Sequence, residues 1–231
     1  MWLHIAYRAV GIFFRYWCRV RIEGVEHIPV QGGVLLASNH ISLLDPVLIS
    51  YAVMATRGVQ IVWAPAKVEL FSVPLLGCLI TSLGAFPVRR GRGDVGAMRR
   101  MIRHMQSEKL LLFPEGTRSR DGRLGYGQRT VGKLLHEARP VVIPTAVWGT
   151  DRVLPPGKGI PRWHTQIGVR YGKPLDLQRY YALPGTKETA VAIVQELMQA
   201  IAALIAMDRP TTTVAPTRSS RQGYHDEASS V

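Results

Sequence analysis

The longest uncharged stretch of this 231-residue chain, Leu70 to Val88, decides between a membrane-spanning protein and a layered α/β domain. Its 19 residues approach the length of a transmembrane helix, which needs roughly 20 apolar residues. The stretch is interrupted, however, by residues that disfavour one continuous helix: Pro74, Gly77, Gly84 and Pro87. It therefore predicts a short apolar helix over about 71–82 and then a strand that ends in Phe86-Pro87-Val88.

Apolar runs alternate with helical segments along the rest of the chain. Strands are expected at about 20–26, 33–37, 59–64, 109–113, 141–147 and 166–171, and helices at about 46–56, 95–107, 129–138 and 189–207. This alternation predicts one α/β domain over residues 21–207, with a central mixed sheet flanked by helices. Residues 208–231 are rich in Thr, Ser, Pro and Arg and are predicted to be a disordered tail.

Residues 1–20 predict an amphipathic helix that precedes the domain. His4, Arg8, Arg15 and Arg19 fall within a wedge of roughly 60° at about 100° per residue, and apolar and aromatic residues occupy the rest of the circumference. A membrane-spanning helix is disfavoured because an arginine at the bilayer centre is costly. A basic stripe on an apolar, Trp-rich helix favours a position in the membrane interface, and the alternative is a helix packed on its own domain.

The charge of the chain favours anionic partners. Its 29 Lys and Arg against 16 Asp and Glu give a net charge of +13, which suits an anionic membrane surface or a phosphorylated substrate. No nucleic-acid partner is predicted, because RNA-binding signatures and zinc-finger spacing are lacking. Cys18 and Cys78 stand in apolar surroundings and are predicted to be small buried hydrophobes, and neither a metal site nor a cofactor is expected.

A histidine and an aspartate follow the apolar run 33–37 at a spacing of five residues. On a helix, His40 and Asp45 would point roughly 140° apart, so they can meet only if a turn bends the chain between them. Asp45-Pro46 is typical of a helix start, with the aspartate as N-cap and the proline in the first turn. The stretch is either a base-and-orienter pair or a capping turn with an incidental histidine.

Two further loops at expected strand ends carry unusual polar residues: Arg89-Arg90 and Glu115-Gly116-Thr117-Arg118. Alone, each is explained by a solvated face or a turn. Together the three loops provide a base, a carboxylate to orient it, and cations that bind a phosphate, which suits transfer of a group onto a hydroxyl of a phosphorylated molecule. A serine nucleophile is disfavoured because the chain has no Gly-x-Ser-x-Gly elbow.

Four ordered segments give the chain a resemblance to the glycerolipid acyltransferases, and to their lysophosphatidate branch in particular. They are Asn39-His40-x4-Asp45, Gly84 to Arg90, Phe113 to Ser119, and Val142-Ile143-Pro144, and the similarity covers about residues 24–176. The resemblance implies that His40 is the general base and Asp45 its partner. It also implies that the glycerol-phosphate part is bound by Arg89 or Arg90, Glu115, Gly116, Thr117 and Arg118, with Lys67 assisting.

The resemblance further implies direct acyl transfer from acyl-CoA or an acyl carrier protein to the sn-2 hydroxyl of 1-acylglycerol-3-phosphate, without a cofactor. The expected location is the cytoplasmic face of the cell membrane, as a peripheral or monotopic protein. Arg89 departs from the family pattern, which usually has an acidic residue there. Another lysophospholipid, an ornithine lipid or a glycolipid therefore stays open as acceptor, as does an inactive membrane-surface protein. The helix at 71–82 either lines an acyl-chain groove or packs in the core.

Overall fold

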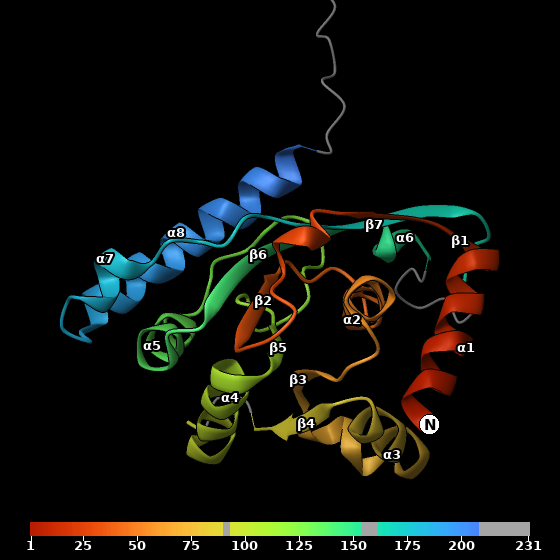
Figure 1. Cartoon of the computed structure of the whole chain (residues 1–231), viewed down its shortest axis with the longest axis horizontal. Helices are drawn as coiled ribbons and strands as arrows, with labels where there is room; N and C mark the ends of the chain where they lie inside the picture. The colour runs from red at the N-terminus through yellow and green to blue at the C-terminus, as the bar shows by residue number, and fades with distance from the viewer. Residues whose placement is uncertain (90–92, 154–160, 208–231) are drawn as a thin grey trace, which may run out of the picture.

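A seven-stranded sheet runs through the part of the chain that the computed structural model describes, residues 1–89, 93–153 and 161–207 (Figure 1). The strands are β1 (Cys18–Glu23), β2 (Val34–Ser38), β3 (Val62–Lys67), β4 (Ala85–Val88), β5 (Lys109–Leu112), β6 (Val141–Trp148) and β7 (Thr165–Tyr171). They lie in the order β1-β7-β6-β2-β5-β3-β4. Only the β6–β7 pair is antiparallel, which confirms the predicted mixed sheet.

The centre of the sheet is β2, which pairs with β5 on one side and β6 on the other. All residues of β2 and β5 are buried, as expected for parallel strands covered on both faces. Leu36 lies beside Leu111 on β5 and Ile143 on β6, so one layer of aliphatic side chains crosses three strands. This packing fixes the carboxyl end of β2, where the predicted histidine loop begins.

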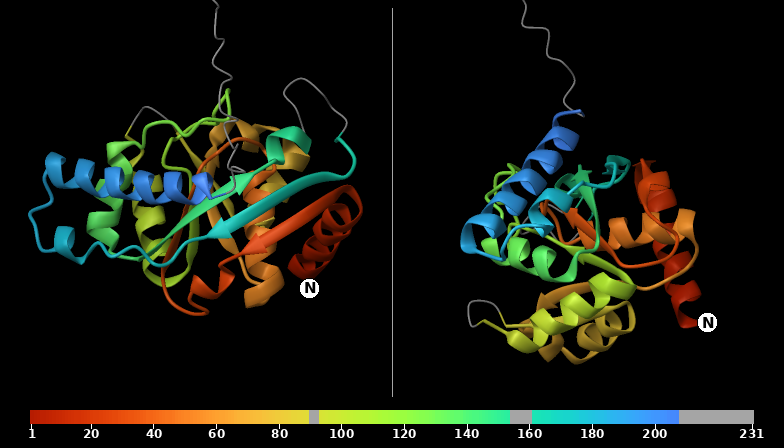
Figure 2. Two further views of the ribbon diagram at one scale, coloured as in Figure 1. Left: turned by 90° about the horizontal axis from the view of Figure 1, so that it is seen from above. Right: turned by 60° about the vertical axis from the view of Figure 1, so that its left-hand side comes forward.

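Helices cover both faces of the sheet (Figure 2). On one face lie α4 (Val95–Ser107), α5 (Arg129–Ala138) and α8 (Lys187–Ala206), whose apolar sides pack on Leu35 and Leu110. On the other lie α1 (Trp2–Trp17) and α2 (Asp45–Arg57), which pack on Leu36 and Leu111. Alternate strand residues therefore face two separate cores, as the pleat requires.

The remaining elements are short: η1 (Val25–His27), η2 (Val68–Ser72), α3 (Pro74–Ser82), α6 (Thr150–Val153) and α7 (Gln178–Tyr181). The predicted break of the uncharged stretch into a helix and a strand is confirmed by α3 and β4. The N-terminal helix is shorter than the predicted 1–20, because α1 ends at Trp17 and β1 begins at Cys18. Arg19 therefore belongs to the edge strand of the sheet and not to the helix. The predicted tail, 208–231, lies outside the described residues.

Two expectations for the apolar helix differ from the structure. Gly77 is the only buried residue of α3, so this helix does not pack in the core. Cys78 is likewise exposed, whereas Cys18 is buried as predicted. The one helix in the described segments that is long and apolar enough to cross a membrane is α8. Its inward side packs in the core through Ile193, Val194, Leu197 and Ile201.

Candidate active site

The histidine loop is anchored to the middle of the sheet by Asn39. The Asn39 side chain donates from Nδ2 to the carbonyl of Val147 on β6 at 3.0 Å, and its Oδ1 accepts from the Val147 N–H at 2.8 Å. Asn39 is buried, so both bonds are sheltered from water. A side chain thus continues the β2–β6 pairing by one residue and sets the direction in which the chain leaves the strand.

His40 and Asp45 meet as a hydrogen-bonded pair, with Nδ1 and Oδ2 2.8 Å apart. The same Oδ2 accepts the N–H groups of Ile41 and Ser42, each at 2.7 Å. The sequence-based expectation that a turn brings the two side chains together is confirmed. The expected capping role is wrong: α2 begins at Asp45 itself, and the carboxylate points back to the loop amides. The His40 imidazole and the N–H groups of Ile41 and Ser42 therefore converge on one oxygen of the Asp45 carboxylate.

Thr150 supplies a fourth donor to the aspartate. Its hydroxyl lies 2.5 Å from Oδ1 of Asp45, and both residues are fully buried. Thr150 opens α6 with one residue between it and the end of β6, at the same sheet edge as the end of β2. Both carboxylate oxygens are therefore held by donors, which leaves the aspartate one orientation toward the imidazole.

The chemistry of this pair follows from which nitrogen carries the proton. A carboxylate only accepts hydrogen bonds, so the bond at Nδ1 assigns the proton of neutral His40 to that atom. The lone pair is then on Nε2, where it can take a proton from a bound hydroxyl. The ring stacks on Phe113, with the ring centroids 3.9 Å apart, and this contact restricts its rotation. The site therefore holds an imidazole with a fixed orientation, and its role as a base stays a prediction.

Glu115 joins the third predicted segment to the histidine loop. One carboxylate oxygen accepts the His40 N–H at 3.1 Å, and the other accepts the Gly125 N–H at 2.8 Å. Ser119 adds a bond from its N–H to the His40 carbonyl at 2.7 Å. The geometry gives Glu115 a structural contact with the base, and its predicted part in substrate binding stays a prediction.

Gly116 is needed for the shape of this loop. Its φ of +72° lies in the left-handed region that favours glycine. A Cβ here would come 1.8 Å from Nε2 of Gln128, whose side chain bonds the carbonyl of Glu115. Within the described contacts, Gly116 therefore makes room for Gln128. The predicted close approach of substrate to this glycine stays a prediction.

A cavity of about 710 Å³ opens along the same loop. Thr117 and Arg118 line it, and so do two more cations, Arg120 and Arg123. Two acidic side chains, Glu115 and Asp121, line it as well. Hydrogen bonds from the Arg123 N–H and the Ser119 hydroxyl hold the pKa of the Asp121 carboxyl below its usual value. The cavity therefore combines hydroxyl and guanidinium donors of the kind that bind a phosphate.

Lys67 and Arg89 lie at the same sheet edge as His40 but two strands or more from β2. Lys67 ends β3 beside Val88, and Arg89 follows β4 directly. Both are exposed. The Arg89 N–H bonds Asp94, and this bond, after that of Ala97, lowers the pKa of the Asp94 carboxyl. Asp94 thus caps α4, since its side chain accepts the Ala97 N–H. Arg90 lies outside the described residues.

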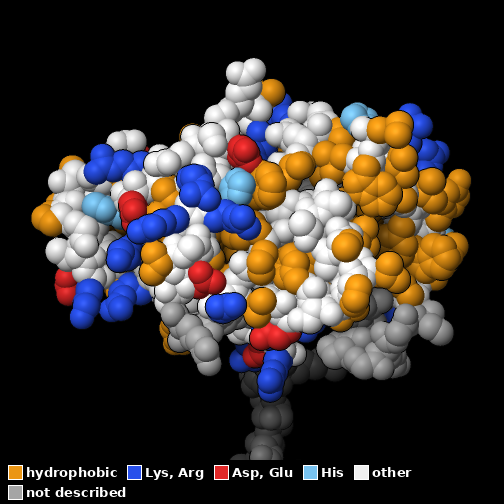
Figure 3. All heavy atoms as spheres, turned by 90° about the horizontal axis from the view of Figure 1, so that it is seen from below, with side chains coloured by type: hydrophobic (Ala, Val, Ile, Leu, Met, Phe, Trp, Pro, Cys, Tyr) orange, Lys and Arg blue, Asp and Glu red, His pale blue; other side chains and the backbone are white. Residues whose placement is uncertain are grey.

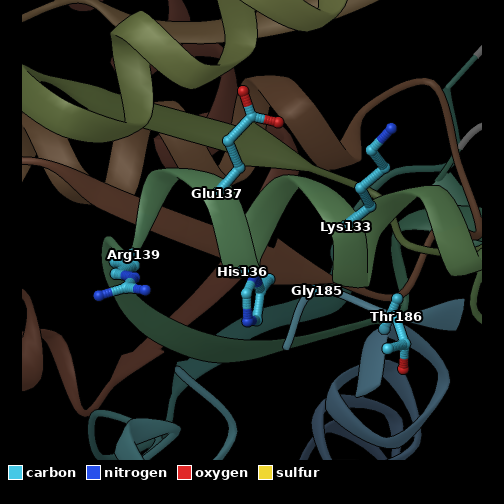
Figure 4. A pocket seen from close by; sticks show the side chains of 7 residues that line it. Lys133, His136, Glu137, Arg139, Gly185 and Thr186 are labelled. Atoms are coloured by element: carbon cyan, nitrogen blue, oxygen red, sulfur yellow. The ribbon is translucent and has the colours of Figure 1, made fainter. Parts of the chain in front are cut away.

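A second cavity, of about 400 Å³, lies between α5 and the segment that leads into α8 (Figure 4). Its lining on α5 includes Lys133, His136, Glu137 and Arg139 (Figure 4), and His136 Nε2 bonds the carbonyl of Leu183 at 2.9 Å. It contains none of the residues predicted from the sequence. In the described segments, no cluster of three His, Cys, Asp or Glu side chains is arranged to hold a metal ion.

Sequence reasoning missed the residues that hold the His40 side chain and its loop in place. Asn39, Phe113, Gln128 and Thr150 contact the His40 loop or its partners from four different segments. The available signal was position in the chain, because one residue separates Thr150 from the end of β6, just as one residue separates His40 from the end of β2. Polar residues at the carboxyl ends of neighbouring parallel strands gather at one edge of a sheet.

A protein-family model matches the part of the chain that carries the predicted site residues. The model of the family described as Acyltransferase matches residues 19–148, more than half of the chain. The chain belongs to the acyltransferase family. The matched range contains every residue predicted for the site, whereas Thr150 falls just beyond it.

Several similar curated proteins are named 1-acyl-sn-glycerol-3-phosphate acyltransferases. A chloroplastic 1-acyl-sn-glycerol-3-phosphate acyltransferase of Arabidopsis thaliana is 27% identical over 68% of this chain and 44% of its own length. The enzyme of that name from Limnanthes douglasii is 30% identical over 60% and 48%, and that from Borreliella burgdorferi is 24% identical over 58% and 52%. The chain spans about half the length of these curated relatives.

A solved structure shares the fold. The crystal structure of the 1-acyl-sn-glycerophosphate acyltransferase PlsC from Thermotoga maritima aligns with a TM-score of 0.67 and 23% identity, over 88% of this chain and 80% of that one. This acyltransferase domain therefore has the same α/β architecture.

Proposed function

We propose that this protein transfers a fatty acyl group from a thioester, acyl-CoA or an acyl carrier protein, to the free sn-2 hydroxyl of 1-acylglycerol-3-phosphate and so makes phosphatidic acid. The observation that carries the proposal is the His40–Asp45 pair, with Nδ1 and Oδ2 2.8 Å apart and both carboxylate oxygens held by further donors. Family membership and the names of the relatives support the substrate class.

In the proposed mechanism His40 Nε2 removes the proton of the acceptor's sn-2 hydroxyl while the hydroxyl oxygen attacks the thioester carbonyl. Asp45 keeps Nδ1 protonated and stabilises the imidazolium that forms. The C–O bond forms first, the tetrahedral intermediate then expels the thiolate, and the imidazolium returns its proton to the sulfur. The histidine ends neutral, so one turnover consumes nothing but the two substrates.

The phosphate of the acceptor is proposed to bind in the cavity lined by Thr117 and Arg118, with Lys67 and Arg89 contributing cations from the ends of β3 and β4. Arg90, which lies outside the described residues, is the alternative to Arg89. Paired charge-assisted hydrogen bonds would hold the glycerol so that its hydroxyl reaches Nε2 of the histidine. A second candidate is the same chemistry on another lipid acceptor. It is favoured by Arg89, which stands where the resembling family usually has an acidic residue.

Lipid product analysis after incubation with lysophosphatidate and mixed acyl-CoAs tests the proposal. The wild-type protein should form phosphatidic acid. His40→Ala should form none while keeping its circular dichroism spectrum and thermal transition. His136→Ala is the matched control, because this histidine is bonded to a carbonyl in the other cavity and should not affect turnover. Full activity of His40→Ala would refute the mechanism.

A panel of acceptors separates the two candidate functions. Lysophosphatidate, a neutral monoacylglycerol, an ornithine lipid and a glycolipid are offered with the same acyl-CoA. A strong preference for the phosphorylated glycerol supports the first candidate. Equal rates on acceptors without a phosphate would exclude it and support the second.

The proposed location is the membrane surface, with α1 as the contact. One side of α1 packs on the domain through Phe14 and through Tyr7, which stacks on Tyr51. Another side exposes Ile5 and Ile12. The packing alternative for residues 1–20 therefore holds for one side of this helix, and the interfacial alternative stays a proposal for the exposed side. Because Phe14 is 1% exposed, α1 should be tested by substitution of its outer residues rather than by deletion.

A further inference from the structure

The segment η2–α3 exposes an unusual amount of aliphatic side chain to solvent. Leu75 is 88% exposed, Val73 is 53% exposed and Leu79 is 43% exposed. No charged residue stands between Leu70 and Val88. Exposed apolar patches of this kind mark sites of interaction with membranes or with other proteins, because water solvates them poorly.

This surface continues onto α1. The indole N–H of Trp2 donates to the Ser82 hydroxyl at 2.9 Å, which joins the first turn of α1 to the last turn of α3. The outer apolar residues of α1 lie within a wedge of roughly 80° at about 100° per residue: Trp2, Ile5, Ile12 and Tyr16. Figure 3 shows hydrophobic side chains gathered over the part of this face that carries α1 and α3.

Cations border the apolar surface. The exposed basic residues Arg8 and Arg15 form a stripe on α1 beside its apolar side, and exposed Lys67 stands just before η2. Glu69, in η2, is the acidic residue of the segment. With a net charge of +13, two copies of the chain repel one another, whereas an anionic leaflet attracts each of them. The charge therefore favours a lipid surface over a second copy as the occupant.

We propose that η2–α3 is a second membrane contact beside α1, with the aliphatic side chains of residues 70–79 inserted among the lipids of an anionic leaflet. The segment begins at the carboxyl end of β3, the same sheet edge from which His40 projects. One part of this proposal rests on the proposed function: the contact would let a lysolipid move laterally from the leaflet to His40. The membrane contact itself does not depend on turnover.

Cys78 allows a direct measurement, because it is exposed on α3 while Cys18 is buried. An environment-sensitive fluorophore on Cys78 should shift to the blue with vesicles of phosphatidylglycerol and phosphatidylcholine, and quenchers on the lipid chains should quench it. The control protein, Cys78→Ser with Ser107→Cys at the end of α4, should keep its spectrum. An unchanged Cys78 spectrum in vesicle-bound protein would overturn the proposal. So would a shift that appears without vesicles as protein concentration rises, because it would assign the face to a second copy.

Vesicle flotation gives the second measurement. Leu75→Glu should weaken binding to the same vesicles by roughly tenfold or more, because it replaces an apolar contact with a charge repelled by the lipid. The matched control is Val191→Glu, at a 40% exposed position on α8, and it should bind as wild type does. Leu75→Glu that floats as well as wild type would contradict the contact. Failure of the wild type to acylate any acceptor, with vesicle binding intact, would instead count against the proposed function.

Discussion

Thr150→Val removes one hydroxyl from the site and little else, because valine has nearly the same shape as threonine. In the wild type this hydroxyl lies 2.5 Å from Oδ1 of a fully buried Asp45. A hydrogen bond to a charged group contributes about 1.5–3 kcal/mol, and the loss falls in this range because the oxygen stays buried without its donor. For a chain of this size, that free energy lowers Tm by about 3–12 °C.

The same substitution should lower kcat by about tenfold and leave KM for both substrates unchanged, since Thr150 bonds the aspartate and does not line the cavity proposed for the phosphate. Urea unfolding measures the stability loss, and initial rates with lysophosphatidate and acyl-CoA measure the catalytic loss. Thr150→Ser keeps the donor and should restore most of the rate. The reasoning is refuted if Thr150→Val unfolds within about 0.5 kcal/mol of wild type and keeps its kcat.

Three further outcomes are expected. Glu115→Gln keeps one acceptor but weakens the hold on the His40 N–H, so it should lower kcat/KM about tenfold; unchanged steady-state kinetics would contradict this contact. Gly132→Ala should lower the free energy of unfolding by about 1–3 kcal/mol, because the added Cβ would come 1.9 Å from the Ala190 carbonyl oxygen. Its control is Gly96→Ala, at an exposed position of α4, which should be neutral or stabilising in the same urea titration. Burial lowers the pKa of Lys109 in the folded protein, so between that pKa and 10.5 the unfolded chain binds more protons than the folded one. The contribution of Lys109 to the free energy of unfolding therefore increases with pH in this range. Lys109→Met should flatten this increase, and identical unfolding profiles of the two proteins at alkaline pH would refute the reasoning.

The sequence was sufficient for features that depend on neighbouring residues. Apolar runs such as Val34–Ser38 are buried strands because a parallel strand covered on both faces needs apolar residues throughout. Pro74 and Gly84 bound α3 because backbone geometry at these residues disfavours a longer helix. The His40–Asp45 pair could be predicted from its spacing, since a five-residue separation on a turn lets the two side chains meet.

The tertiary structure decided what depends on residues far apart in the chain. A proline inside a strand favours an edge, a bulge or a strand end. The strand β6 nevertheless lies inside the sheet, and Pro144 stands where the β6–β7 pairing stops at Thr145. Thr150 reaches Asp45 only because β6 lies beside β2, and the spacing of 105 residues carries no local signal. The exposure of α3 was equally hidden, because an apolar helix has the same sequence pattern whether protein or solvent surrounds it. Burial is a property of the packed chain, and local sequence gives only the preference for it.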